Sequence, residues 1–537
     1  MTIESKAGPR IADSQASEST AACMLDTVDI QASPAADRAL QAALALFAEL
    51  NEAGIRYCHW KSNVRLEQAL AGRTDLDLLV DPDHAGRFKA ILLRRQVKQA
   101  IAAPGKRYPD VENYLGFDPE TGRQFHLHVH YRLVLGEQFV KNYRLPLEKE
   151  FLDSAQVHQG VKIPAPNLEL AVLSLRALLK YRDRDALKDA LKIRRPGLPR
   201  DILAEVQHLL TLVPLGQLDA TLDDLSAILP ASAIRAFLDL TVMDPRNGRR
   251  LYALRRQVRR GLRPYQRHGR LRASLAYYGA LWRRRKRMRL SRPDDKMKLA
   301  SGGLTLALIG ADGSGKSTMS KLLCGWLSWK LSVRRYYLGS KEPSRRSRTL
   351  YIMFRAARRG RRSLEASLGE ANPVSRVFAR IRDWLFDAHS LSLGYDRRDV
   401  YRAGLQDADA ASVVLFDRFP LRAPLDGPRL QLSIDGRSDA ITRAMAENED
   451  RVYGDIRPAD HFLVLRVSPD VSLGRKPDHR PEAIAAKCRA VDQFLAGDMP
   501  LDFNVASADG PLAMAIDADQ PFEQVELALK RCLWALL

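Results

Sequence analysis

The sequence predicts an α/β protein in two parts. A three-layer domain with a parallel sheet forms the carboxy-terminal half, and a smaller α+β domain with a helical appendage precedes it. Three observations support this prediction. The chain of 537 residues is too long for a single core. From residue 304 onward, short apolar strands alternate with helical patterns, as in a parallel sheet. Arginine dominates residues 246–298, which is typical of a connector between domains.

The composition describes a strongly basic protein of ordinary hydrophobicity. Hydrophobic residues make up 46% of the chain, and the formal net charge of +21 favours acidic partners such as nucleotides, nucleic acid or an anionic membrane face. The five cysteines are odd in number and scattered, which argues against a disulfide framework and for a reducing compartment. The amino terminus lacks a signal-peptide pattern, so we expect a cytoplasmic protein.

The first folded domain is expected at residues 36–165. Residues 1–35 are rich in Ala, Ser, Asp and Thr without periodicity, which favours a disordered lead-in. Asp75 and Asp77 stand two apart in a predicted strand, and the strand period of two places both carboxylates on one face. Such a pair suits a divalent cation that carries the phosphates of a nucleotide, so both are candidate metal ligands. The alternative is a pair of surface charges on an edge strand.

This domain resembles the nucleotidyltransferase superfamily. The resemblance rests on the strand and polar turn at 55–63, the Asp-x-Asp strand, and residues 127–132. These last read L-H-V-H-Y-R where a poorly characterised bacterial group reads roughly I-D-L-H-W-R. The resemblance implies nucleotidyl transfer at the two aspartates. The expected Gly-Ser turn reads Lys61-Ser62, however, and His128 stands at the third carboxylate position. Losing one of three acidic ligands favours a degenerate, substrate-sensing domain.

Three histidines, His126, His128 and His130, alternate along the same predicted strand and so share a face. They are a candidate metal site of lower rank, because no Cys or Asp partner stands at a fixed spacing.

A helical appendage is expected at 166–245, followed by an arginine-rich amphipathic connector at 246–300. Two apolar stripes run through the connector; they are Leu251, Leu254, Val258 and Leu262, then Leu271, Leu275, Tyr278 and Trp282. Residues 246–298 could lie on an anionic membrane surface, bind nucleic acid through phosphates, or form solvated linker helices. Nucleic acid ranks last, because no base-reading motif accompanies the charge.

Residues 304–318 combine a buried strand, a glycine-rich loop and the start of a helix. The loop matches G-x-x-x-x-G-K-S, the P-loop pattern, in which consecutive backbone N–H groups and the helix N-terminus surround a phosphate. We expect Lys316 to reach the β- and γ-phosphates of ATP and the Ser317 hydroxyl to bind Mg²⁺. The candidate nucleotide-binding residues are Gly310, Asp312, Gly313, Ser314, Gly315, Lys316, Ser317 and Thr318.

Four further strands follow the glycine loop in the sequence. They are expected at 333–338, 412–420, 461–467 and 512–516, with a closing helix at 521–536. A basic insertion at 345–382 precedes a long helix at 383–403.

The domain at 301–537 resembles the thymidylate kinase family of nucleoside monophosphate kinases. The motifs that carry the resemblance are the glycine loop, Asp417-Arg418-Phe419 at a strand end, and a segment rich in Arg and Lys at 468–480. The resemblance implies that Asp312 contacts the acceptor sugar, and that Asp417 and Arg418 serve the metal and the acceptor phosphate.

Some members of this family place a catalytic arginine in the glycine loop. This loop has Gly313 and Ser314 at those positions. The charge therefore has to come from the Arg- and Lys-rich segment at 468–480, called the lid below, through Arg475, Lys476 or Arg480. The candidate catalytic residues are Lys316, Asp417, Arg418, Arg475 and Arg480, and the candidate Mg²⁺ ligands here are Ser317 and Asp417.

Three functional hypotheses follow. The first is ATP- and Mg²⁺-dependent phosphoryl transfer to a nucleoside monophosphate or a related phosphorylated acceptor. The second is nucleotidyl transfer at Asp75 and Asp77 with a regulatory ATP-binding domain. The third is a non-enzymatic, ATP-gated factor at the membrane periphery that uses the connector. Self-association as a homodimer is left open.

Overall fold

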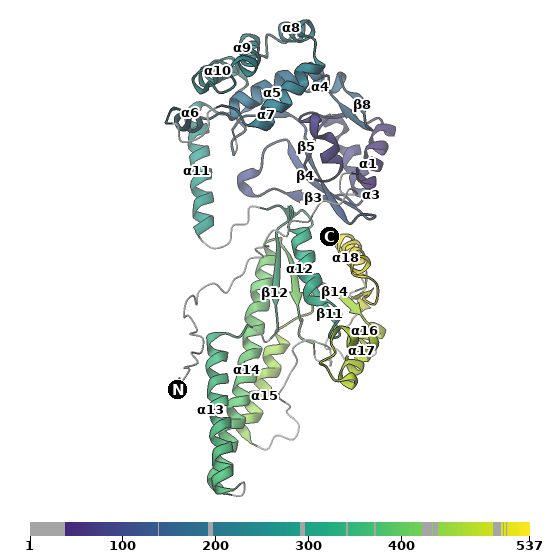
Figure 1. Ribbon diagram of the computed structural model, residues 1–537, viewed down its shortest axis with the longest axis vertical. Helices are drawn as coiled ribbons and strands as arrows, with labels where there is room; N and C mark the ends of the chain where they lie inside the picture. Colours follow the sequence, from purple (N-terminus) through teal and green to yellow (C-terminus); the bar gives the residue numbers. More distant parts are fainter. Residues whose placement is uncertain are drawn as a thin grey trace, which may run out of the picture.

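Two large sheets organise the chain, and they lie one beyond the other along the long axis of the molecule (Figure 1). The computed structural model describes residues 38–137, 139–191, 197–289, 296–339, 342–369, 372–421, 432, 439–497, 506–507, 510–511 and 513–537. The lead-in expected at 1–35 lies outside the described residues. The prediction of an α/β protein with a parallel sheet is confirmed.

The first sheet has six strands in the order β1-β2-β5-β4-β3-β10. The strands are β1 (Tyr57–His59), β2 (Leu76–Val80), β3 (Lys98–Ile101), β4 (Val111–Asp118), β5 (Arg123–His130) and β10 (Lys298–Leu299). The first domain also contains α1 (Gln41–Glu52), α2 (Leu66–Leu70), α3 (Ala85–Arg94) and α4 (Glu148–Asp153). Two small hairpins are β6 (Leu133–Leu135) with β7 (Tyr143–Leu145) and β8 (Gln156–His158) with β9 (Val161–Ile163).

Alternation along β5 separates the core from the polar face. Phe125, Leu127 and Val129 are buried in the cluster that includes residues of α1 and α3, while His126, His128 and His130 point to the opposite face. Strand β2 runs parallel to β5, and the register places Asp77 beside His128. Because side chains alternate along a strand, the carboxylates of Asp75 and Asp77 lie beside the imidazoles of His126 and His128 on one face of the sheet.

A helical layer covers the end of the first domain. It comprises α5 (Pro166–Lys180), α6 (Asp183–Ala190), α7 (Arg200–Leu212), α8 (Leu215–Asp224), α9 (Ala231–Met243) and α10 (Gly248–Gly261). Helix α10 falls in the segment expected as a connector, yet Leu251 and Val258 are buried in this layer. Arg255, only 1% exposed, donates to Glu137 and Asp183. This first apolar stripe of the connector is therefore core, and a membrane surface cannot reach it.

The second apolar stripe of the connector is exposed rather than buried. Helix α11 (Arg270–Arg289) leaves Leu271, Leu275, Tyr278 and Trp282 exposed, by 64% or more. Only part of the connector thus offers apolar side chains to a partner. None of the described helices combines the length and apolar character that crossing a membrane requires.

The second sheet has five parallel strands in the order β12-β13-β11-β14-β17. These are β11 (Leu304–Gly310), β12 (Val333–Tyr337), β13 (Val413–Asp417), β14 (His461–Arg466) and β17 (Ala513–Asp517). Its helices are α12 (Lys316–Leu327), α14 (Pro373–Asp409), α15 (Ala440–Gly454), α16 (Pro469–Arg475), α17 (Pro481–Ala496) and α18 (Phe522–Leu536), and β15 (Ala506–Ser507) pairs with β16 (Gly510–Pro511). Because β11 and β13 are adjacent and parallel, the glycine loop and Asp417 meet at the same edge.

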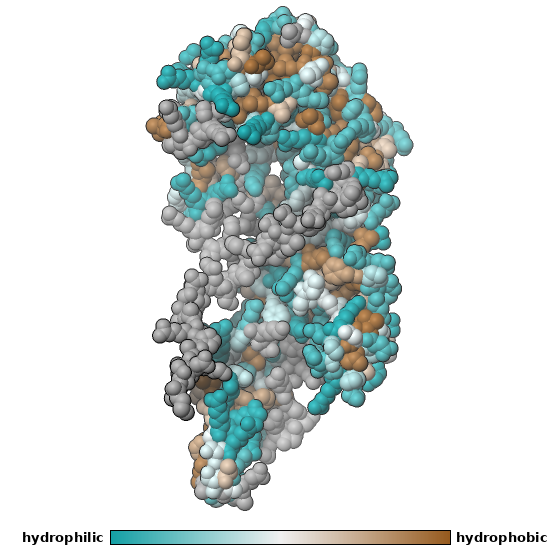
Figure 2. Space-filling view, in the orientation of Figure 1, coloured by the Kyte–Doolittle hydropathy of each residue, from teal (hydrophilic) through white to brown (hydrophobic). Residues whose placement is uncertain are grey.

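The described part of the basic insertion expected at 345–382 is largely helical. It forms α13 (Arg345–Leu368) and the first part of α14, and the two long helices pack as a hairpin that extends away from the sheet (Figure 1). The long helix thus begins ten residues earlier than the sequence indicated, at Pro373, a residue that suits the first helical turn. On the face drawn in Figure 2, hydrophilic residues predominate and hydrophobic ones gather in small groups.

Contacts join the two sheet domains directly. Strand β10 pairs with the edge strand β3, so the residues just before the second sheet complete the first. Phe117 of β4 packs against Trp326 and Trp534, with ring centroids 5.7 and 5.4 Å away. The Lys330 ammonium, just beyond α12, lies 2.6 Å from the carboxylate of Asp75. The far end of the helix that begins at the glycine loop therefore rests on the first domain.

Candidate functional site

The glycine loop (residues 310–317) follows β11 and opens α12. Gly310 has φ 155°, and a Cβ there would lie 2.5 Å from the Leu465 carbonyl oxygen. Gly313 has φ 79°, and a Cβ there would lie 2.9 Å from the Ser472 carbonyl oxygen. Side chains at these positions would push the loop off β14 and α16, so the glycines keep the backbone folded tightly over the sheet edge. Such a loop presents its N–H groups to an anion.

Lys316 is the first residue of α12 and is buried. Its ammonium donates to the carbonyl oxygens of Gly310 at 2.9 Å and Ala311 at 2.6 Å. Ser317 and Thr318 follow in the first helical turn and are exposed. A phosphate oxygen is a stronger acceptor than a carbonyl, because the hydrogen bond becomes charge-assisted on both sides. A phosphate bound in the loop would therefore replace these carbonyl oxygens as the partner of the Lys316 ammonium.

Asp417 ends β13 and is fully buried. One carboxylate oxygen accepts hydrogen bonds from Arg335 at 2.6 Å and from Ser320 at 3.4 Å. The other oxygen, Oδ1, has no hydrogen-bond partner among the described residues. A buried carboxylate oxygen without a partner costs free energy, which a cation or a metal-bound water would recover. With the Ser317 hydroxyl one helical turn before Ser320, the donor set is oxygen-rich and fits Mg²⁺.

Arg418 follows in the left-handed backbone region at φ 61°. Residues other than glycine adopt that region at a cost of roughly 1–3 kcal/mol, and such strain gathers at functional sites. Both neighbours anchor the position: Asp417 is buried, and Phe419 packs against Phe416 and Phe462. The strand end is thus fixed on either side of Arg418 and turns at that residue.

The lid contacts the loop through residues of α16 and α17. Arg475 donates to the Gly313 carbonyl oxygen at 3.4 Å, whereas Arg480 lies at the exposed start of α17. Lys487 of α17 donates to the carboxylate of Asp312, and the His479 ring lies 3.9 Å from the same carboxylate. The structure thus brings Arg475 to the loop, and it places Asp312 in an ion pair with the lid.

Sequence reasoning missed two cations of this site, Arg335 and Lys487. Arg335 had a usable signal, since it stands inside a predicted strand of a buried sheet, where a charged side chain needs a partner. Its partner in the structure is Asp417, two residues beyond Leu415, which is opposite Arg335 on the neighbouring strand. Lys487 had no such signal, because a lysine on a helix face is usually solvated.

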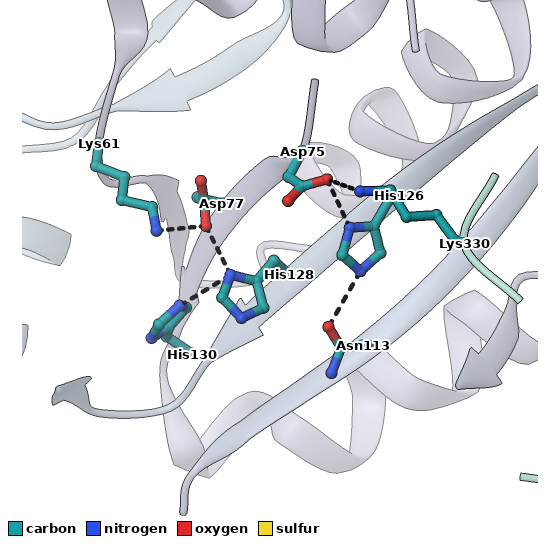
Figure 3. A network of polar contacts seen from close by, with 8 residues as sticks. All are labelled: Lys61, Asp75, Asp77, Asn113, His126, His128, His130 and Lys330. Carbon is teal, nitrogen blue, oxygen red and sulfur yellow. Dashed lines mark hydrogen bonds and ion pairs between the residues drawn. The ribbon is translucent and has the colours of Figure 1, made fainter. Parts of the chain in front are cut away.

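A second polar cluster lies on the first sheet (Figure 3). Asp75 accepts a hydrogen bond from His126 at 2.8 Å and from Lys330 at 2.6 Å. Asp77 pairs with Lys61 at 2.6 Å and with His128 at 2.8 Å. Burial raises the pKa of Asp77, but Lys61 and His128 outweigh it and hold that pKa well below its usual value.

The two aspartates have separate partners. Each has its own histidine and its own lysine, and the group of three metal-capable residues found in the described part of the chain is Asp77, His128 and His130. A divalent cation at Asp77 would have to displace the Lys61 ammonium from the same carboxylate oxygen. The metal-ligand pair expected from the sequence is thus neutralised by protein cations.

Comparisons with known proteins add little. No family model matches the chain, and neither does any curated protein. Among solved structures, it is similar to a deoxyadenosine kinase from M. mycoides with bound dATP, at 14% identity and a TM-score of 0.24. That similarity covers 43% of this chain and 99% of the kinase. It is too weak to assign a fold or an activity, so any functional assignment rests on the geometry of the site.

Proposed function

We propose that the carboxy-terminal domain transfers a phosphoryl group from ATP to a small phosphorylated acceptor, with a nucleoside monophosphate as the leading class. One observation carries the proposal: a glycine loop with its buried lysine faces Asp417, whose second carboxylate oxygen has no described partner. Phosphoryl transfer requires two polyanions held in line and their developing charge neutralised. This edge of the sheet concentrates the groups that do so.

Each residue has a role in that chemistry. The loop N–H groups and the start of α12 hold the β- and γ-phosphates, and Lys316 exchanges its carbonyl partners for phosphate oxygens. Ser317 and Asp417 would hold Mg²⁺, which neutralises phosphate charge when bound. Arg475 and Arg418 supply positive charge from the lid and the strand end. The acceptor contacts Asp312 once Lys487 releases it.

The decisive experiment measures ADP release from ATP and Mg²⁺ against a panel of nucleoside monophosphates, dTMP first. Lys316→Ala should lower the stimulated rate at least 100-fold, since losing one charge-stabilising group costs roughly 10²–10³ in rate. Lys321→Ala, an exposed lysine on the same helix, is the matched control and should keep the rate. Retained activity in Lys316→Ala would overturn the proposal.

Nucleotidyl transfer at Asp75 and Asp77 is less well supported. Each carboxylate is already neutralised, and burial leaves Asp77 little access to a hydrated metal ion. Incorporation of labelled nucleotide into an acceptor, lost in Asp77→Asn, would revive it.

A further inference from the structure

A small cavity in the first domain is surrounded by positive charge. It measures about 40 Å³, and four of its lining residues are cationic: Lys61, Lys141, Arg176 and Lys180. They come from three separate places, the turn after β1, the segment between β6 and β7, and successive turns of α5. Folding therefore gathers four cations that are far apart in the sequence.

Carboxylates of the protein neutralise this charge only in part. Lys61 pairs with Asp77 at 2.6 Å, but no ion pair joins Lys141, Arg176 or Lys180 to an acid within the described residues. Arg176 lies over the Trp60 ring, at 5.4 Å from its centroid, and Lys61 also lies over this ring, at 4.8 Å. Of the two buried acids nearby, Glu169 is engaged by Asn63 and Glu205 has one oxygen without a described partner. A cationic excess is left at the cavity.

That excess has a measurable consequence at Lys141. Burial, together with the charges of Lys61, Arg176 and Lys180, lowers the pKa of Lys141 to about 7. Like charges held this close together destabilise the fold unless an anion joins them. Since Lys and Arg offer hydrogen-bond donors and no acceptors, the matching ligand is rich in acceptor oxygens and negatively charged.

We propose that this cavity binds one phosphate group of a small phosphorylated ligand, at a site separate from the glycine loop. The size supports this assignment. A water molecule needs roughly 10–15 Å³ of such volume, so about 40 Å³ holds one phosphate but no nucleoside. The cavity is partly open, so the remainder of the ligand extends into solvent. Arg176 offers the planar fork that binds two phosphate oxygens together.

Chemical labelling of the full-length protein tests the proposal without any substitution. At pH 7 about half of Lys141 is the reactive neutral amine, so acetic anhydride should acetylate it faster than an exposed lysine such as Lys149. Inorganic phosphate, a sugar phosphate and AMP are compared at equal ionic strength with chloride. Protection of Lys141, at least threefold relative to Lys149 and mapped by mass spectrometry, supports the site with whichever of the three protects. No protection by any of them overturns it.

Binding measurements separate this site from the glycine loop. In a Lys316→Ala background, the best-protecting ligand should still bind, because the cavity lies in the other domain. Adding Arg176→Met should weaken that binding at least tenfold, whereas adding Lys149→Met should change it less than twofold. Undiminished binding with Arg176→Met would contradict the proposal. If phosphoryl transfer fails but Lys141 is protected, the proposed kinase function falls and this site stands.

Discussion

The glycine loop and the polar cluster of Figure 3, here called the Asp77 cluster, both gather charge for an anion or a metal, but they are built in opposite ways. The loop uses backbone over eight consecutive residues, with one lysine folded onto carbonyl oxygens. The cluster uses side chains from β2 and the residue just before it, from β5, from the turn after β1 and from the segment after α12, and each aspartate already has a lysine and a histidine. The loop is thus ready for a ligand, whereas the cluster first has to lose a cation.

Among the substitutions that test this contrast, Asp417→Asn has the largest expected effect. The change keeps the shape but removes the charge that would meet Mg²⁺, so we expect the acceptor-stimulated rate to fall roughly 100-fold or more. The Mg²⁺ concentration for half-maximal rate should rise as well. Asp492→Asn alters an exposed carboxylate of α17 that pairs with Arg466, and it should leave both quantities unchanged. An unaffected Mg²⁺ dependence in Asp417→Asn would remove Asp417 from the metal site.

In the first domain, the sharpest test concerns Glu169. Burial raises the pKa of this carboxyl to about 7, from 4.5 in the unfolded chain, despite two hydrogen bonds from Asn63. A raised acid pKa means that the folded state holds its proton longer, so stability falls as pH rises from about 4.5 to 7. Glu169→Gln should therefore flatten that decline, by about 2–3 kcal/mol between pH 5 and 8.

Urea unfolding at both pH values measures the effect. The control is Asp81→Asn, a partly buried acid of the same domain that pairs with the exposed Arg56. An equal decline in wild type and Glu169→Gln would show that the Asn63 hydrogen bonds keep Glu169 ionised. The hydrogen bonds that hold the turn with Lys61 and Asn63 would then be made to an ionised carboxylate.

The same contrast explains what the sequence could predict. The loop pattern is local, so spacing alone predicted the strand, the loop and the start of α12, and the β11–β13 register then brought Asp417 beside them. Strand alternation likewise predicted the shared face of His126, His128 and His130. Lys61, Lys141 and Arg176 converge only through tertiary packing, which no spacing encodes. The α10 stripe resembled a surface helix because its arginines outnumber its leucines, yet Leu251 and Val258 are core.

The smallest predicted effect lies where the two regions touch. Lys330→Met removes the ion pair between the end of α12 and Asp75, whose side chains are 24% and 39% exposed. At that exposure the pair contributes about 0.5–1 kcal/mol, so we expect a melting temperature only a few degrees lower. Burial raises the pKa of Asp75 but His126 and Lys330 outweigh it, so the stabilisation is present above pH 4 and is lost as pH falls further.

ATP affinity provides the control for Lys330→Met. The glycine loop lies at the opposite end of α12, and the aromatic contacts of Phe117 with Trp326 and Trp534 still fix the helix after the substitution. We therefore expect ATP binding to change less than twofold while the melting temperature falls. If the free energy of ATP binding falls by more than the free energy of unfolding, then Asp75 acts on the glycine loop through α12. The glycine loop and the Asp77 cluster would then be energetically coupled.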